Sequence, residues 1–302
     1  MFSSLVRPLL TAGLAVALII GLREGEAAQQ HAGVSITFLA NEGVMLSSGS
    51  KKVLIDALFE KYGPGFAVPV DSTQTALVGA RAPFDAVDLV LVTHRHGDHF
   101  HPAPVAAHLR ANPRATLLTS QQVIDSLRHH VEPNDAIRRR FMPRTTKPGT
   151  RRRETVNGIS VELLGLPHGH WRNRNVQHLG YIVELGGRRV LHVGDTDIDE
   201  DAFRPLRLDT ARIDVALLPQ WMVTSDDGRD VIRRWIRPKQ VVAFHVAEGG
   251  GQQAVQSVQT ALPVPSPSPV RSRRERGSSA QRAIPGTSRQ MQTSSVPSLD
   301  AR

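Results

Sequence analysis

The sequence predicts an α/β (α+β) protein in which helices lie on the outside of packed sheets. Three observations support this fold class. The chain has 302 residues, of which 40% are hydrophobic, so it is long enough to bury a sizeable core. Short β-rich runs alternate with helix-like segments, a rhythm that fits helices laid against a sheet. The polar residues that could carry chemistry follow predicted strands, which brings distant side chains to one edge of a sheet.

The predicted elements follow one another along most of the chain. The early runs are short, are separated by turn residues at 41–43 and 47–50, and predict a strand meander. A Gly-Gly turn at 186–187 predicts a hairpin. The predicted strands span 34–39, 44–46, 52–56, 89–92, 115–119, 158–166, 179–185, 188–193, 213–218 and 240–244. The predicted helices span 72–80, 102–110, 120–130 and 227–236.

A tight turn after one of these strands holds four side chains of metal-ligand type. An apolar run of strand length, Leu89–Val92, precedes it. The turn then supplies His94, His96, Asp98 and His99. Side chains two apart in an extended segment point to the same side, so His94 and His96 can hold one ion together. Asp98 and His99 come next and can face a second ion close to the first.

Composition restricts the ligand chemistry of this turn. The chain has no cysteine, so a metal must sit on His and carboxylate ligands, and Cys nucleophiles are excluded. The chain has 13 His, and a chance pair would be unremarkable, but four of them fall within residues 94–101 beside an Asp. Histidines packed so closely would repel one another on protonation. A paired metal site here would polarise an ester oxygen and hold a hydroxide at neutral pH.

The residues THRHGDH at 93–99 resemble the HxHxDH signature of the metallo-β-lactamase superfamily. The resemblance covers about residues 34–247 and implies a four-layer αββα sandwich. It also implies a third His on the first ion, after the strand at 158–166. His168, which Gly follows, is favoured for this place, and His170 is its competitor. In the GDTD segment at 194–197 the resemblance implies that Asp195 bridges both ions, and after the last strand it implies His245 as the final ligand.

The residues and the resemblance together define a ligand set for two Zn²⁺ ions, and Mn or Fe would suit the same ligands. The first ion takes His94, His96 and His168, the second takes Asp98, His99 and His245, and Asp195 lies between them. Asp98 is the expected catalytic residue, because it lies close to the activated water and could accept or return a proton. Asp56 either supports the metal loop, as the resemblance implies, or caps a strand end.

These expectations describe a metal-dependent hydrolase of a small-molecule ester, lactone or phosphodiester. The bridging Asp195 resembles the lactonase and phosphodiesterase branches more than the β-lactamases. Two other enzymes stay open: a nuclease or phosphodiesterase on extracellular nucleic acid, and an iron-dependent oxidoreductase on the same fold. A metal-free binding protein is a further class, and the complete ligand set argues against it.

The two ends of the chain differ in character from the expected hydrolase domain at 31–250. Residues 1–27 have the pattern of a secretory signal, with Arg7 before an apolar run at 9–22 that is short for a membrane span. We therefore expect a periplasmic or secreted protein, which would contact a membrane only through an uncleaved N-terminal segment. Residues 260–302 are rich in Ser, Pro, Arg and Gln and predict a disordered basic tail, either native or produced by a shifted reading frame.

The formal net charge of +9 does not predict a nucleic-acid partner. Seven Arg and only two acidic residues lie in 260–302, so the charge of the remaining chain is unexceptional. A second basic stretch at 138–153 predicts a solvated loop. His108 is expected on a helix surface without a role. The sequence leaves the oligomeric state open.

Overall fold

The computed structural model describes residues 33–60, 63, 65–169 and 171–246. The predicted signal at 1–27 and the predicted tail at 260–302 lie outside this part of the chain. The described residues form two six-stranded sheets with helices beside them. Of the helices described, none is long and apolar enough to cross a lipid bilayer.

The first sheet contains strands β1 to β6 in chain order. Strands β1, β2 and β3 form the predicted antiparallel meander, and β3 to β6 run parallel. The six strands are β1 (Ser35–Ala40), β2 (Gly43–Ser48), β3 (Lys51–Ile55), β4 (Leu89–Val92), β5 (Thr116–Ser120) and β6 (Phe141–Arg144).

The second sheet has the order β12-β11-β10-β9-β8-β7. Strands β7 to β10 are antiparallel, with the predicted hairpin between β9 and β10, and β10 to β12 run parallel. Its strands are β7 (Arg151–Val156), β8 (Ile159–Gly165), β9 (Leu179–Leu185), β10 (Arg188–His192), β11 (Val215–Pro219) and β12 (Gln240–Phe244).

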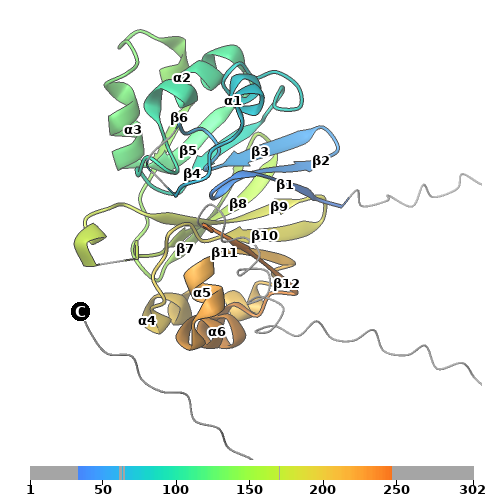
Figure 1. The fold of residues 1–302 in the computed structure, drawn as a ribbon, viewed down its shortest axis with the longest axis vertical. Helices are drawn as coiled ribbons and strands as arrows, with labels where there is room; N and C mark the ends of the chain where they lie inside the picture. The colour runs from blue at the N-terminus through green and yellow to red at the C-terminus, as the bar shows by residue number, and fades with distance from the viewer. Residues whose placement is uncertain (1–32, 61–62, 64, 170, 247–302) are drawn as a thin grey trace, which may run out of the picture. The chain divides into compact units, whose positions relative to one another are not determined.

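Helices cover the outer face of each sheet (Figure 1). The first sheet is covered by α1 (Asp71–Val78), α2 (Pro102–Ala111) and α3 (Gln121–Arg128). The second sheet is covered by α4 (Glu200–Phe203), α5 (Gln220–Thr224) and α6 (Asp226–Val231). Single turns complete the set at η1 (Ala136–Arg140), η2 (Trp171–Asn173), η3 (Arg204–Leu206), η4 (Leu208–Thr210) and the π-helical η5 (Ile232–Ile236).

The alternation of side chains along the strands explains why four layers form. In β4, Leu89 and Leu91 pack between the two sheets, whereas Val90 and Val92 pack under the helices of the first sheet. All four are buried, because both faces of a parallel sheet are covered in such folds. Tyr181 of β9 joins the layer between the sheets from the other side. The predicted αββα sandwich is therefore confirmed.

The strand directions bring several loops to one edge of the sandwich. The loops that follow β3 and β4 leave the first sheet at the same end, because these strands are parallel. In the second sheet β8, β10 and β12 share one direction, so their following loops also leave together. Carboxyl ends of parallel strands are where open α/β sheets place their ligands.

Two sequence expectations are wrong. The stretch 138–153 is not a solvated loop, because most of it lies in η1, β6 and β7 and four of its arginines form ion pairs with Glu154 or Glu162. Arg144 forms a bidentate ion pair with Glu154, and Arg153 donates a hydrogen bond to Glu162. His108 is not a surface residue: it is fully buried in α2, and its Nδ1 lies 2.6 Å from Leu77 O.

Candidate metal centre

Strand β4 delivers the predicted ligand turn to the shared sheet edge. The strand stays extended through Val92, and the chain then folds back on itself. The N–H groups of His99 and Phe100 both donate to His96 O, at 3.1 and 2.9 Å. This tight turn brings imidazoles from both of its ends to one place, which a continuing strand would not do.

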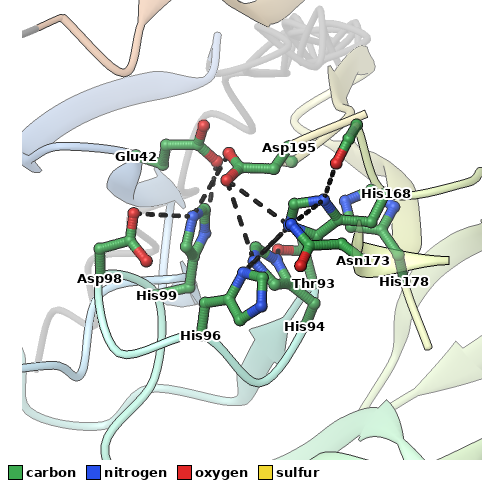
Figure 2. Close-up of polar contacts among 12 residues, drawn as sticks. Glu42, Thr93, His94, His96, Asp98, His99, His168, Asn173, His178 and Asp195 are labelled. Atoms are coloured by element: carbon green, nitrogen blue, oxygen red, sulfur yellow. Dashed lines mark hydrogen bonds and ion pairs between the residues drawn. The ribbon is translucent and has the colours of Figure 1, made fainter. Parts of the chain in front are cut away.

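Three imidazoles converge in the first group of this centre. The distances between His94 Nε2, His96 Nδ1 and His168 Nε2 are 3.0 to 3.2 Å (Figure 2). Asp195 Oδ2 lies 3.9 Å from His94 Nε2 and 3.8 Å from His168 Nε2. Three ring nitrogens and a carboxylate oxygen that face one point are the donor set of a divalent transition metal.

Short contacts fix His168 in this group. Its segment pairs with the segment of Asp195 through a bridge between His168 and Thr196, and Gly169 N–H donates to Asp195 O at 2.6 Å. His168 Nδ1 lies 2.5 Å from Gly169 O. A proton on Nδ1 leaves the lone pair on Nε2, which is the atom that faces the other imidazoles.

The second group lies beside the first and shares Asp195 with it. His99 Nε2 lies 3.4 Å from Asp195 Oδ1 and 3.6 Å from Asp98 Oδ2. His245 Nε2 lies 3.6 Å and 3.4 Å from the same two oxygens. His245 follows β12 in a left-handed conformation (φ 55°), and its N–H donates to Asn41 O at 3.2 Å, which holds the residue at the sheet edge.

Asp56 supports both groups from beneath. Its buried carboxylate accepts hydrogen bonds from Thr93 N–H at 2.8 Å, Thr93 Oγ1 at 2.6 Å and His99 Nδ1 at 2.9 Å. Thr93 Oγ1 in turn lies 3.1 Å from His94 Nδ1. One carboxylate therefore orients an imidazole of each group, so that the opposite ring nitrogen points to the centre.

Burial decides the charge of the first group. It lowers the pKa of His94, His96 and His168 below its ordinary value, so these rings are neutral at pH 7 and offer lone pairs. His99 differs: burial opposes its protonation, but the carboxylates of Asp195 and Glu42 raise its pKa well above the usual value. The second group therefore favours a positive charge at the position where its carboxylates meet.

Several buried polar atoms here have no hydrogen-bond partner among the described residues. They are Glu42 Oε1 and Oε2, His99 Nε2 and Asp195 Oδ1. An isolated buried polar atom costs free energy, and a buried carboxylate costs more. All four atoms belong to the second group or adjoin it, and together they are anions and a ring nitrogen, which is what a cation binds. The residues present therefore fit a metal centre.

Sequence reasoning missed Glu42. It lies in the Asn41–Gly43 turn between β1 and β2, and turn carboxylates are usually solvated. The residue is instead fully buried, and burial raises the pKa of its carboxyl well above the ordinary value. The apolar runs on both sides of this turn were the only sequence indication that the turn lies against the fold.

An open cleft of about 540 Å³ leads to both groups. Phe66 and Trp221 lie against the ring of His245, with ring-centroid distances of 5.8 and 5.1 Å. The described lining holds no Lys or Arg and includes the carboxylate of Asp197. The lining residues are Phe66, His96, Asp98, His168, Gly169, Asn173, Asp195, Asp197, Trp221 and His245.

The structure brings all seven side chains singled out in the sequence to one centre. They are His94, His96, Asp98, His99, His168, Asp195 and His245. His170, the competitor of His168, lies outside the described residues. His192 of β10 is buried, and its Nε2 lies 3.1 Å from Glu42 O.

Comparisons with known proteins identify the family. A family model described as a beta-lactamase superfamily domain matches residues 51–266, more than half of the chain. The UPF0173 metal-dependent hydrolase of Polaromonas sp. is 26% identical over 228 residues, 70% of this chain and 76% of that protein. The UPF0173 metal-dependent hydrolase of Thermococcus kodakarensis is 26% identical over 220 residues, 70% of this chain and 84% of that protein.

Solved structures share the same sandwich. The isothiocyanate hydrolase from Delia radicum gut bacteria has a TM-score of 0.50 and 18% identity, and the match covers 75% of this chain and 90% of that one. Igni18, a metallo hydrolase from Ignicoccus hospitalis, has a TM-score of 0.50 and 17% identity over 76% of this chain and 91% of that one. At this identity the likeness shows the fold alone. The family match and the fold together show that the chain belongs to the beta-lactamase superfamily.

Proposed function

We propose that this chain is an exported hydrolase that uses two divalent cations to cleave a neutral ester or lactone. The observation that carries the proposal is the convergence of seven His and Asp side chains, with unpartnered buried atoms facing one another. Membership of the superfamily, and relatives named as metal-dependent hydrolases, support the coarser statement that the chain is a metal-dependent hydrolase.

Each group of side chains would hold one cation. His94, His96 and His168 would hold the first, Asp98, His99 and His245 would hold the second, and Asp195, whose two oxygens face different groups, would be shared between them. Bound there, two divalent cations would polarise the substrate carbonyl and acidify a water at neutral pH. Three imidazoles and a carboxylate suit Zn²⁺, and Mn or Fe would accept the same ligands.

Asp98 is the proposed proton acceptor. It lines the cleft, and its Oδ2 lies 3.4 Å from His245 Nε2 of the second group. Burial alone would raise its pKa, but the hydrogen bond from His245 and the charge of His99 hold that pKa below the ordinary value. The group is therefore ionised at neutral pH and can take a proton from a nucleophile or return it to a leaving group.

The cleft favours a neutral, partly apolar substrate. Phe66 and Trp221 provide an aromatic wall, and Trp221 is held in place because its indole N–H donates to Thr196 O at 3.1 Å. A phosphodiester would meet no Lys or Arg on the described lining. The carboxylates in the same cleft would also offset much of the charge of the cations. Esters and lactones therefore rank before phosphodiesters and nucleic acids.

A substrate panel tests the proposal. Purified, metal-loaded protein is assayed with aryl esters, lactones, bis-p-nitrophenyl phosphate and nitrocefin, and its metal content is measured by elemental analysis. The variants His96→Ala and Asp195→Ala should lose at least about 100-fold in kcat/KM, because each removes a cation ligand. Exposed residues supply the matched controls His129→Ala and Asp201→Ala, which should act like the parent protein.

Three results would count against this function. Turnover that survives both ligand variants would come from another site. Bound iron with no hydrolysis of any substrate would favour the oxidoreductase on this fold. Faster turnover of the phosphodiester than of every ester and lactone would reverse the substrate ranking.

Export is the part of the proposal that rests on the sequence alone. Arg7 and the apolar run at 9–22 support it. Fractionation of cells that express the full chain should place the protein outside the cytoplasm, with residues 1–27 removed. Full-length protein in the cytoplasmic fraction would contradict export and leave the metal centre untouched.

A further inference from the structure

The turn between β1 and β2 is clamped against the metal centre by its backbone. Asn41 O accepts the N–H of His245 at 3.2 Å, and Asn41 Nδ2 donates to Asp98 O at 3.3 Å. Glu42 O lies 3.1 Å from His192 Nε2. Gly43 packs so closely that an added Cβ would lie 3.0 Å from Asp56 O. Because the backbone of the turn is fixed on all these sides, the side chain of Glu42 enters the protein.

The carboxylate of Glu42 ends at the second group without a donor. Its exposed fraction is 0%, and neither oxygen has a hydrogen-bond partner among the described residues. Oε2 lies 3.4 Å from His99 Nδ1, but that nitrogen already contacts Asp56 at 2.9 Å. The Asp195 carboxylate adjoins Glu42 (Figure 2). Two carboxylates that touch in a buried site need a cation or a shared proton.

We propose that Glu42 is an additional ligand of the second cation. Glu42, His99, Asp195 and His245 each offer one ligand atom, and these atoms all lie within 4.8 Å of one another. Together with Asp98 they give the second cation three carboxylates and two imidazoles. The first cation has three imidazoles and the shared Asp195. This inference rests on the proposed two-cation centre and adds a ligand from a turn outside the HxHxDH signature.

A neighbouring cluster does not compete for this role. Glu42, Asp56 and His192 also lie within ligand distance of one another. Asp56 is however occupied by three hydrogen bonds, and His192 contacts Glu42 O through Nε2 and the N–H of Gly194 through Nδ1. Only the carboxylate of Glu42 is left without a partner there, so its free oxygens belong to the centre beside His99.

The extra carboxylate makes the two positions chemically unequal. Carboxylate oxygens suit Mn²⁺ and similar hard cations, whereas imidazoles suit Zn²⁺. The second position should therefore discriminate less between Zn²⁺ and Mn²⁺ than the first. Loss of Glu42 should move the preference of the second position toward Zn²⁺.

The substitution Glu42→Gln tests this ligand, because it keeps the shape of the side chain and removes its charge. Metal-free full-length protein is titrated with Zn²⁺ and with Mn²⁺ by calorimetry, and bound metal is counted by elemental analysis after dialysis. The parent protein should bind two ions. The variant should keep the first ion. Its affinity for the second ion should fall by more than the roughly 10–100-fold that is typical when a residue that only orients a ligand is removed.

Thermal unfolding separates a ligand from a structural carboxyl. If Glu42 is a ligand, the metal-free variant should be at least as stable as the metal-free parent, because it lacks an unpartnered buried carboxylate, and its Tm should rise less on addition of metal. The matched control is Glu162→Gln, which alters a buried carboxylate of β8 that is paired with Arg153 and Arg189. This control should lose stability and still bind two ions.

Each result decides between the two claims. Two ions bound by Glu42→Gln with unchanged affinities would overturn the ligand role. A parent protein that binds only one ion would overturn the two-cation centre itself. If Glu42→Gln does not fold, Glu42→Asp serves as the second variant. It keeps the carboxylate but shortens the side chain by one methylene, which moves the carboxylate away from the proposed cation. A normal affinity for the second ion in Glu42→Asp would also overturn the ligand role.

Discussion

Replacement of Asp56 by Asn should weaken metal binding although no proposed ligand is replaced. Asp56 accepts three buried hydrogen bonds, two from Thr93 and one from His99. An Asn side chain keeps one acceptor oxygen and presents an NH₂ group where the carboxylate had a second acceptor. At least one buried donor, the N–H of His99 or the hydroxyl of Thr93, then faces another donor.

The size of the effect follows from these contacts. An unsatisfied buried donor costs about 1–3 kcal/mol, so the free energy of unfolding should fall by about that amount. Residues that orient a metal-bound His are typically worth about 10–100-fold in metal affinity, which corresponds to about 1.4–2.7 kcal/mol. Because His99 contacts Asp56 directly and His94 contacts it through Thr93, the second cation should be weakened more than the first.

Calorimetric titration with Zn²⁺ and denaturant unfolding of the metal-free protein measure the two quantities separately. Asp88→Asn is the matched control, because Asp88 is also a buried aspartate that accepts a backbone N–H, from Lys52 at 3.1 Å, but it precedes β4 instead of following β3. The control should lose stability and retain both Zn²⁺ affinities. If Asp56→Asn bound both ions as tightly as the parent, the orienting role of this carboxylate would be refuted.

Three other perturbations have defined outcomes. Burial raises the pKa of Asp88, but hydrogen bonds from the N–H of Lys52 and the side chain of Arg114 hold that pKa below the ordinary value, so the stabilisation by Asp88 is present above about pH 4 and is lost as pH falls through the folded pKa. Asp88→Asn should therefore flatten the acid side of a stability–pH curve measured by denaturant unfolding, and an unchanged slope would contradict this. Removal of the metal by a chelator should lower Tm, because a free metal concentration of about 100 times the Kd adds about 2.7 kcal/mol per site to the free energy of unfolding. Equal Tm values with and without chelator would show that no stabilising ion binds. Trp221→Ala should raise KM for aryl esters several-fold with a smaller change in kcat, because the indole forms the cleft wall near His245, and a change confined to kcat would argue against that role.

The sequence was most informative where structure is local. The Leu89–Val92 run and the turn after it were predictable because side-chain alternation and ligand spacing are properties of consecutive residues. The ends of the later strands were predictable as well, because each apolar run is followed by polar residues. The four-layer arrangement needed the family resemblance, since nothing local states which sheet a strand joins.

Features that depend on distant partners could not be predicted. Glu42 lies in a turn that looks solvated until the loops after β3 and β12 cover it, and the loop after β12 is far away in the sequence. The stretch 138–153 was predicted to be a solvated loop because its arginines have no carboxylate partners within the stretch. Their partners, such as Glu162, follow only in β7 and β8. His108 is buried because α1 packs on α2 and offers Leu77 O to it. Each error has the same cause, which is a polar side chain whose partner is set by topology.

The metal centre also has a structural consequence, because its side chains come from both sheets. His94, His96, Asp98 and His99 follow β4 of the first sheet, whereas His168, Asp195 and His245 follow strands of the second. Without a cation, the carboxyl groups of Glu42, Asp98 and Asp195 crowd one buried place, and burial and the neighbouring charge of Asp195 raise the pKa of Glu42, so keeping all three ionised opposes the packing of the two sheets at this edge. A cation reverses the sign of that contribution, since the same carboxylates then attract a common partner. We therefore expect metal binding and the closure of the sandwich edge to be linked in free energy, so that the protein should reach its full stability only with the centre filled.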